Sequence, residues 1–246
     1  MAEGTLLNHR GANDVTREEL VAYQTPEPTE TWFPIAHSQV LDVVSDTLGG
    51  AGFQIQRTRL SVAQDGHRFF GVLDLSTSVT DGVTLAVGVR NSTDKSFPIG
   101  FCCGTRVFVC DNLAFTSEIV VSKKHTRFGQ ERYLEGIARA VAGLSQYQEA
   151  AGQWINRLRG WELPEDKANS LILQSYERGL IGSRLLPAVI EEWREPRFEE
   201  YQPRTGWSLW NSFTEVLGRT MQVRQPSAAA ITTIRLQQLL SPSEIN

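Results

Sequence analysis

The chain has 246 residues, of which 41% are hydrophobic and 21% charged, and its net charge is −4. These values exclude wholesale disorder and allow a substantial buried core. The acidic balance excludes a general basic coat for nucleic acid, so any such binding must use a local patch. Because the sequence has neither a run long enough to span a membrane nor the start typical of a secretory signal, we expect a cytoplasmic protein without membrane contact.

The N-terminal part changes from polar to helical and then to strand patterns. Residues 1–31 are polar and end in TPEPTET, which we expect to be extended and exposed. Helical periodicity predicts a helix in HSQVLDVVSDTL, ended by the glycine pair at 49–50. FQIQRTRLSV and RFFGVLDLS then predict two strands around an Asp-Gly turn at 65–66, and a second Asp-Gly pair at 81–82 marks the next turn.

The central part predicts a β-meander. In VTLAVGVR, valine and leucine lie on one face, and small residues and Arg90 lie on the other. FPIGFCCGTRVFVC predicts one long or two short strands, and EIVVS adds another short one. The resulting antiparallel meander of four or five strands has small residues opposite its core. Such a face is either a place where a ligand backbone lies close or a surface covered by a helix.

The last half of the chain is predicted to be helical. Apolar residues from Leu134 to Leu158 repeat about every 3.6 residues, which predicts a long helix packed on the meander. Four later segments also predict helices: LPEDKANSLILQSYERGLI, SRLLPAVIEEW, GWSLWNSFTEVLGRT and AAAITTIRLQQLL. We therefore expect an α+β fold with three parts: a polar N-terminal segment (1–31), an α+β core with the meander and the long helix (32–160), and a helical C-terminal region (161–246).

The chain carries no motif that demands catalysis or a cofactor. Its histidines lie in no recognised protease context, and neither GxSxG nor GxxxxGK[ST] occurs. Cys102 and Cys103 are adjacent and point to opposite faces of a strand, so they are poor disulfide partners, and reduced thiols are expected. The sequence lacks the CxxC-like pair that a zinc site needs, so we expect no metal or other cofactor. The sequence leaves an enzymatic function open and favours a non-enzymatic one.

The segment SKKHTRFGQERY concentrates basic residues where the sheet ends and the long helix begins, with Phe128 and Tyr133 interleaved. Lysine and arginine supply phosphate contacts, and aromatic side chains can stack on bases. The alternative is a solvated helix start with the aromatic residues packed inward. Basic residues of the meander extend this patch if its loops lie on the same side. The candidate nucleic-acid-binding residues are Arg90, Lys95, Arg106, Lys123, Lys124, His125, Arg127 and Arg132.

Polar residues are dense in the stretch 88–115, GVRNSTDKSFPIGFCCGTRVFVCDNLAF. They can be interpreted in two ways. They are either local turn contacts or a small-ligand or catalytic site. The residues of that site would be Arg90, Asn91, Asp94, Lys95, Arg106, Asp111 and Asn112. We also predict that Arg90 and Asp111 meet, which requires the chain to reverse near Cys103-Gly104.

Three stretches of the chain resemble a family of uncharacterised phage- and plasmid-like proteins: NSTDKSFPIGFCCGTRVFVCDNLAF, SEIVVSKKHTRFG and WSLWNSFTEVL. Members also occur in bacterial chromosomes, in forms associated with planctomycete-type bacteria, and the resemblance spans residues 32–240. A meander followed by a long helix also resembles the single-strand annealing recombinases of the Red-beta and Erf type, which oligomerise and hold DNA in a basic groove. The resemblance implies a homo-oligomeric protein that binds or anneals single-stranded DNA in mobile-element or DNA-maintenance biology.

A second hypothesis concerns the C-terminal helices. Trp193, Trp207 and Trp210 are of the residue type favoured as interface anchors, although tryptophan more often packs in a core. They suggest a protein-interaction or scaffold module, for instance one that modulates host defence.

Overall fold

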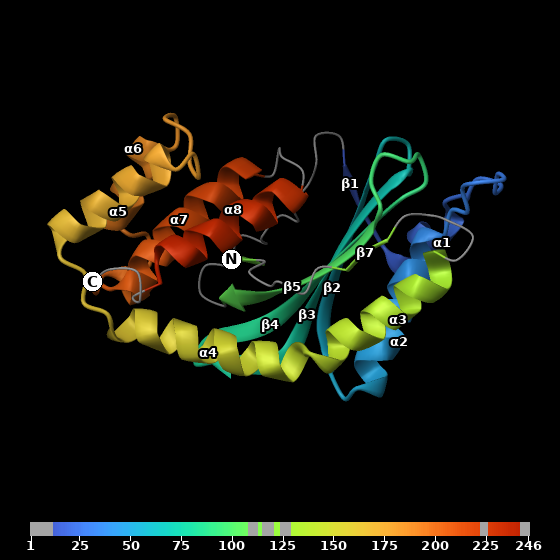
Figure 1. Ribbon diagram of the computed structural model, residues 1–246, viewed down its shortest axis with the longest axis horizontal. Coiled ribbons are helices and arrows are strands. Elements are labelled where there is room, and N and C mark those ends of the chain that lie inside the picture. Colours follow the sequence, from blue (N-terminus) through green and yellow to red (C-terminus); the bar gives the residue numbers. More distant parts are fainter. Residues whose placement is uncertain (1–11, 108–112, 115–120, 124–128, 222–225, 242–246) are drawn as a thin grey trace.

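A computed structural model describes residues 12–107, 113–114, 121–123, 129–221 and 226–241, which form one sheet with helices packed around it (Figure 1). Neighbouring strands follow the order β1-β2-β3-β4-β5-β6, and β7 also pairs with β5. The strands are β1 (Asn13–Val15), β2 (Ile55–Ala63), β3 (Arg68–Thr80), β4 (Val83–Ser92), β5 (Ile99–Val107), β6 (Leu113–Ala114) and β7 (Val121–Lys123). The antiparallel meander β2–β5 confirms the predicted α+β class.

Both Asp-Gly pairs lie in hairpin turns, as predicted. Residues 64–67 connect β2 to β3, and the two residues at 81–82 connect β3 to β4. Gly82 has a φ of +67°, in the left-handed region that glycine enters without the steric cost of a Cβ atom. The turn residues therefore set the register in which β3 and β4 pair.

One face of the sheet packs on helices α2 (His37–Gly50) and α3 (Gly129–Ala142). Figure 1 shows these two helices, followed by α4 (Leu144–Gly160), along the same side of the sheet. Alternate strand residues such as Leu73, Val87 and Phe101 point into this core and are almost fully buried. α1 (Arg17–Ala22) joins the same core through Leu20.

The C-terminal helices form a second core with the far half of α4. They are α5 (Glu165–Glu177), α6 (Leu186–Arg194), the short 3₁₀ helix η1 (Glu199–Tyr201), α7 (Gly206–Met221) and α8 (Pro226–Leu239). Trp193, Trp207 and Trp210 are at most 3% exposed in this core. The tryptophans are thus core residues, and their proposed use as surface anchors is wrong.

One finer prediction needs correction: the long helix is present as two helices, α3 and α4, which meet at Gly143. Ahead of TPEPTET, the N-terminal segment contains two elements that the sequence analysis did not predict. They are β1, which pairs with β2, and α1, which Thr16 caps by accepting a hydrogen bond from the Glu19 backbone N–H. The domain boundaries stay a prediction, although α4 contributes Leu144 to the first core and Leu158 to the second.

Candidate nucleic-acid interface

The face of the sheet turned away from α2 and α3 carries arginine on three strands. Residues directly opposite each other in an antiparallel sheet point to the same side, and side chains alternate along each strand. Arg57 lies opposite Asp74, Arg59 opposite Val72, and Phe70 opposite Arg90. By this register the arginine face, as we call it, contains Arg57, Arg59, Arg68, Arg90 and Arg106. Asp74 is the one acid that the described strands β2–β5 place among them.

Asp74 binds two of these arginines near the end of the sheet that leads to α4. Nη1 of Arg106 lies 2.8 and 2.7 Å from the two carboxylate oxygens, and Nη2 of Arg59 lies 3.6 Å from one of them. The side chains of Arg106 and Asp74 are only 5% and 7% exposed. Asp74 and these two guanidinium groups therefore form a cluster of charges in a region where water screens them little.

Arg90 lies flat on the sheet farther along the same face. A Cβ atom on Gly100, directly opposite, would lie 2.7 Å from Nε of Arg90, so glycine makes room for the side chain. The guanidinium carbon is 5.4 Å from the centre of the Phe97 ring, a cation–π distance. Burial lowers the pKa of Arg90, yet arginine stays protonated at neutral pH.

Cys102 is the other titratable group beside Arg90. Burial raises the pKa of its thiol to about 12, although the positive charge of Arg90 acts in the opposite direction. The thiol is therefore protonated at neutral pH and lacks the depressed pKa of a reactive cysteine. Cys103 points to the opposite face of β5 into the first core, as predicted for adjacent cysteines.

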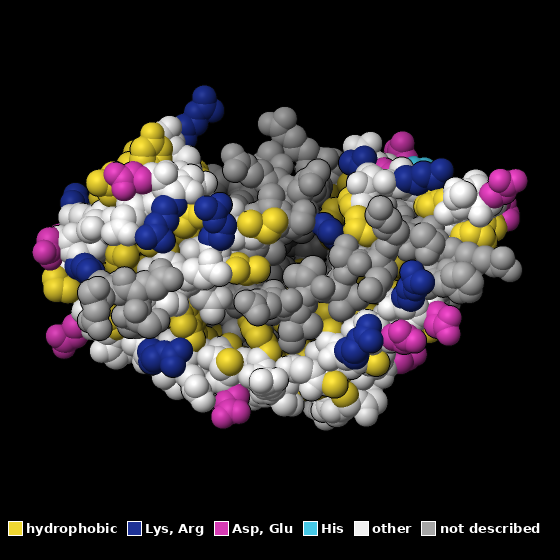
Figure 2. Space-filling model, viewed as in Figure 1, with side chains coloured by type: hydrophobic (Ala, Val, Ile, Leu, Met, Phe, Trp, Pro, Cys, Tyr) yellow, Lys and Arg dark blue, Asp and Glu magenta, His cyan; other side chains and the backbone are white. Residues whose placement is uncertain are grey.

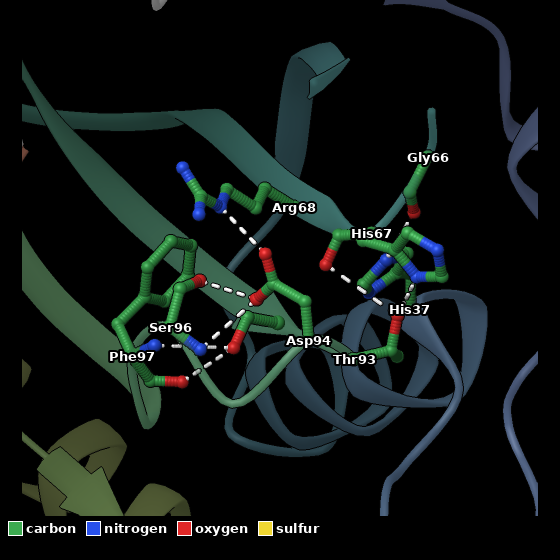
Figure 3. A network of polar contacts seen from close by, with 9 residues as sticks. His37, Gly66, His67, Arg68, Thr93, Asp94, Ser96 and Phe97 are labelled. Atoms are coloured by element: carbon green, nitrogen blue, oxygen red, sulfur yellow. Dashed lines mark hydrogen bonds and ion pairs between the residues drawn. The ribbon is translucent and has the colours of Figure 1, made fainter. Parts of the chain in front are cut away.

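A network of polar contacts holds the end of the sheet where β2 turns into β3 (Figure 3). Arg68 donates to Asp94 at 2.8 Å, and Asp94 accepts further hydrogen bonds from the backbone N–H and the hydroxyl of Ser96. Burial raises the pKa of Asp94, but the hydrogen bonds from Ser96 and Arg68 outweigh it, so the net pKa is below the ordinary value. These contacts fix the 93–98 connection against the 64–67 turn.

The same network continues toward α2. His67 and Thr93 are joined through Nδ1 and the hydroxyl at 3.0 Å, and the backbone N–H of Thr93 donates to the His67 carbonyl. Nε2 of His37 donates to the Gly66 carbonyl at 2.8 Å, because a carbonyl can only accept. Two loops and the start of α2 are thereby locked together at this end of the sheet.

Lys95 stands on this locked connection and is exposed. Its φ is +64°, and its Nζ lies 4.9 Å from the centre of the Trp32 ring. A lysine over an aromatic face keeps its charge while its position is restricted. Lys95, Arg68 and Arg90 are therefore basic residues around one end of the sheet.

The predicted basic residues do not all join this surface. Arg106 is buried against Asp74, six residues from Arg90 in the β4–β5 register, or about 20 Å along the strands. The backbone of Lys123 lies opposite Ile99, beside the connection that carries Lys95, and Arg132 is exposed on α3. Lys124, His125 and Arg127 lie outside the described residues, as does Phe128. The nucleic-acid-binding role of all these residues stays a prediction.

Tyr133, proposed to stack on bases, is 1% exposed in the first core. The alternative, that aromatic residues of the basic segment pack inward, therefore holds for this side chain.

The polar residues of the stretch 88–115 do not form one site. Asn91 points to the face opposite Arg90 and donates to the Ile35 carbonyl at 2.8 Å. Arg90 and Arg106 lie at opposite ends of the strand pair, and Asp94 makes the turn contacts already described. Turn chemistry is thus the better interpretation, while Asp111 and Asn112 lie outside the described residues.

The predicted reversal near Cys103-Gly104 is wrong. β5 runs without interruption from Ile99 to Val107, and Ala86 pairs with Gly104 inside it. The condition that we set for contact between Arg90 and Asp111 is therefore not met.

Three basic residues of this face escaped the sequence analysis: Arg57, Arg59 and Arg68. The alternation that places them on one face is visible in the sequence. Arg57 and Arg59 alternate with Thr58 and Leu60 in β2, and Arg68 and Asp74 are separated by an even number of residues in β3. What the sequence did not show was the register that places them beside Arg90.

Figure 2 shows a hollow between the C-terminal helices and the hairpins, with a basic side chain at its edge. Acidic side chains in this view lie mainly toward the two ends of the molecule. The described parts of the chain contain no cluster of His, Cys, Asp and Glu suited to a metal ion. None of the helices described is long and apolar enough to cross a membrane.

Comparison of the chain with models of protein families, with curated proteins and with solved structures finds no match.

Proposed function

We propose that the protein binds single-stranded nucleic acid, without catalysis, through the phosphate contacts of the arginine face. The observation that carries the proposal is the excess of arginine on this face of β2–β5, where five arginines stand beside two acids: Asp74, which binds Arg59 and Arg106, and Asp94, which binds Arg68. Arg57 is exposed, Arg90 is half-buried and the side chain of Arg68 is 35% exposed, so these three can reach a ligand.

The strand rows between these arginines are buried: Ala86 is 0% exposed, Gly88 is buried, and Gly100 lies beneath the Arg90 side chain. A phosphate would therefore contact the guanidinium groups and not the strand backbone. The sequence resemblance to phage- and plasmid-like proteins and the likeness to annealing recombinases agree with binding or annealing in mobile-element or DNA-maintenance biology. That likeness also motivates the proposed homo-oligomer.

The experiment is fluorescence anisotropy of a labelled single-stranded oligonucleotide between about 50 and 200 mM salt. Four phosphate contacts, from Arg57, Arg68, Arg90 and Lys95, give a log–log slope of about −2.8, which is about a 50-fold loss of affinity over this range. Arg57→Gln combined with Arg90→Gln should reduce the slope by about 1.4. Arg184→Gln, on an exposed arginine between α5 and α6, is the matched control and should change nothing.

Absence of binding at the lowest salt concentration would contradict the proposed function. Equal slopes for the double variant and the control would place the binding elsewhere on the protein.

One observation still supports the alternative of a protein-interaction module, although the tryptophans are buried. Leu173 and Tyr176 on α5 are 50% and 43% exposed, more than most large hydrophobic residues of the described chain. Leu173→Lys combined with Tyr176→Lys should abolish capture of a partner from the native host if α5 is the docking surface, and leave nucleic-acid affinity unchanged.

A further inference from the structure

We propose that the outer face of α3 is the surface through which two copies of this chain associate, with the two α3 helices packed antiparallel. The inference deepens one part of the proposed function, the homo-oligomer, and does not depend on nucleic-acid binding. It starts from an apolar ridge on α3, formed by Leu134, Ala138 and Ala142, which are exposed. Where Figure 1 places α3, Figure 2 shows hydrophobic side chains at the surface beside basic and acidic ones.

The opposite face of α3 anchors the helix in the fold. Tyr133, Ile137 and Val141 lie in the first core and are at most 2% exposed. Leu134 belongs to the same apolar repeat in the sequence, yet it is 42% exposed, one of few large hydrophobic side chains that the described chain leaves exposed. A partner helix would bury it.

The spacing of the ridge suits packing against a second helix. Leu134, Ala138 and Ala142 are four residues apart, and rows with this spacing interdigitate in the commonest class of helix pair. In an antiparallel pair with its two-fold axis beside Ala138, Leu134 of one copy lies opposite Ala142 of the other. A large side chain therefore meets a small one on each side of the axis, and Ala138 lets the two helices approach closely.

Charged residues beside the ridge are complementary in the same arrangement. Glu135 and Arg139 are exposed, and neither forms an ion pair with a described residue of its own chain. Around a two-fold axis beside Ala138, Glu135 of one copy lies near Arg139 of the other, and symmetry repeats the pair. A parallel pair would instead place each of these charges beside its own copy. Charge complementarity thus selects a second copy of this chain, in antiparallel orientation.

The size of the contact predicts a weak dimer. A single pair of crossed helices buries less than the roughly 1,200–2,000 Å² of a stable complex, which is typical of transient association. We therefore expect a dissociation constant on the order of 10 µM.

Sedimentation equilibrium of the whole protein between about 1 and 200 µM measures this constant. The average mass should rise with concentration from that of one chain toward that of two. Leu134→Lys should weaken association about tenfold or more, because it places a charge at the centre of the contact. Leu173→Lys, at an exposed leucine of α5, is the matched control and should leave the constant unchanged. Circular dichroism spectra should be the same for all, because both leucines lie outside the cores.

Charge reversal tests which residues face each other. Glu135→Arg and Arg139→Glu should each weaken association about tenfold, because each replaces two unlike charge pairs by two like ones. The double variant exchanges the charges and restores both pairs, so its dissociation constant should return close to that of the unchanged protein. Losses that simply add in the double variant would show that Glu135 and Arg139 do not meet across the interface.

A cysteine at the axis tests the register of the two helices. Ala138→Cys should bring two thiols to the Cβ separation of about 3.5–4.5 Å that a disulfide requires, so oxidation should yield a covalent dimer that a reducing agent reverses. Ala150→Cys, at an exposed alanine of α4, should give no more covalent dimer than the unchanged protein with its own three cysteines.

These results are read independently of nucleic-acid binding. A protein that stays monomeric at the highest concentration, or a dimer that Leu134→Lys leaves as strong as Leu173→Lys does, would overturn the interface even if oligonucleotides bind. A dimer that responds to the substitutions as described would support the interface even if no oligonucleotide binds.

Discussion

Asp74 is the residue on which the geometry of the arginine face depends most. It is buried, it accepts two contacts from Nη1 of Arg106, and it lies within ion-pair distance of Arg59. Removing one partner from such a cluster leaves charge in a poorly solvated place, which costs far more than the intact cluster contributes.

Asp74→Asn should therefore lower the free energy of unfolding by about 3 to 5 kcal/mol. Asp46→Asn, on an exposed acid of α2, should stay within about 0.5 kcal/mol of the unchanged protein. Chemical denaturation measures both. Similar values for the two variants would show that Asp74 does not hold the arginines in place.

Asp94 makes the stability of the folded protein depend on pH in a predictable direction. Its pKa in the folded protein is below the ordinary value, because the Ser96 and Arg68 hydrogen bonds outweigh the effect of burial. The stabilisation is therefore complete above the unfolded pKa of about 3.9 and is lost as the pH falls through the folded pKa.

The melting temperature of the unchanged protein should exceed that of Asp94→Asn by a constant amount between about pH 5 and 7. The difference should shrink below about pH 4, where the carboxylate becomes protonated. A difference that grows toward acid pH would contradict the assigned direction of the shift.

At the scale of elements, the turns are where local sequence determines structure most directly. The β3–β4 connection needs only Asp81 and Gly82. A Cβ atom on Gly82 would meet nothing within 4 Å, so the positive φ alone requires glycine there. The tight turn holds the register that brings Arg90 opposite Phe70.

Gly82→Ala should cost about 1 to 2 kcal/mol, the penalty of a left-handed conformation for a residue with a Cβ. Gly182→Ala is the control, since Gly182 also has open space around its Cβ position but no positive φ. It should be neutral or stabilise the protein by up to about 1 kcal/mol. Equal effects of the two substitutions in thermal melts would show that the turn is not strained by alanine.

The sequence allowed the elements to be predicted better than the interface. Asp-Gly turns, alternation and helical periodicity are local, so the meander and the positions of α5 to α8 could be predicted. β1 has three residues and lacks a recognisable pattern, and its pairing depends on a distant strand. The arginine face likewise depends on the register between three strands, because Arg57, Arg68 and Arg90 are separated along the chain by whole hairpins.

At the scale of the whole molecule, α4 connects the two cores. Leu144 packs in the sheet core, whereas Trp154 and Leu158 pack with the C-terminal helices. Gly152 allows this approach, because a Cβ there would lie 2.8 Å from the Val79 carbonyl oxygen of β3. Val83 and Val107 of the sheet also belong to the C-terminal core. Removing residues 161–246 would therefore expose part of the sheet core.

The shared helix predicts that both cores unfold together. Five of the six tryptophans (all except Trp32) lie between 154 and 210, so their fluorescence reports on the C-terminal half. Thermal transitions followed by this fluorescence and by far-ultraviolet circular dichroism should coincide, as expected for a cooperative unit. Transitions separated by several degrees would indicate that the sheet and the helices unfold independently.

Protection of individual arginines from chemical modification tests the central claim most directly. The whole protein is treated with phenylglyoxal, with and without a saturating single-stranded oligonucleotide, and the modified arginines are identified by mass spectrometry. Arg57 and Arg90 should be protected by the oligonucleotide, and Arg184 and Arg139, which are exposed on other surfaces, should react equally in both samples. Bound oligonucleotide that leaves Arg57 and Arg90 as reactive as before would contradict the assignment of the arginine face as the nucleic-acid interface.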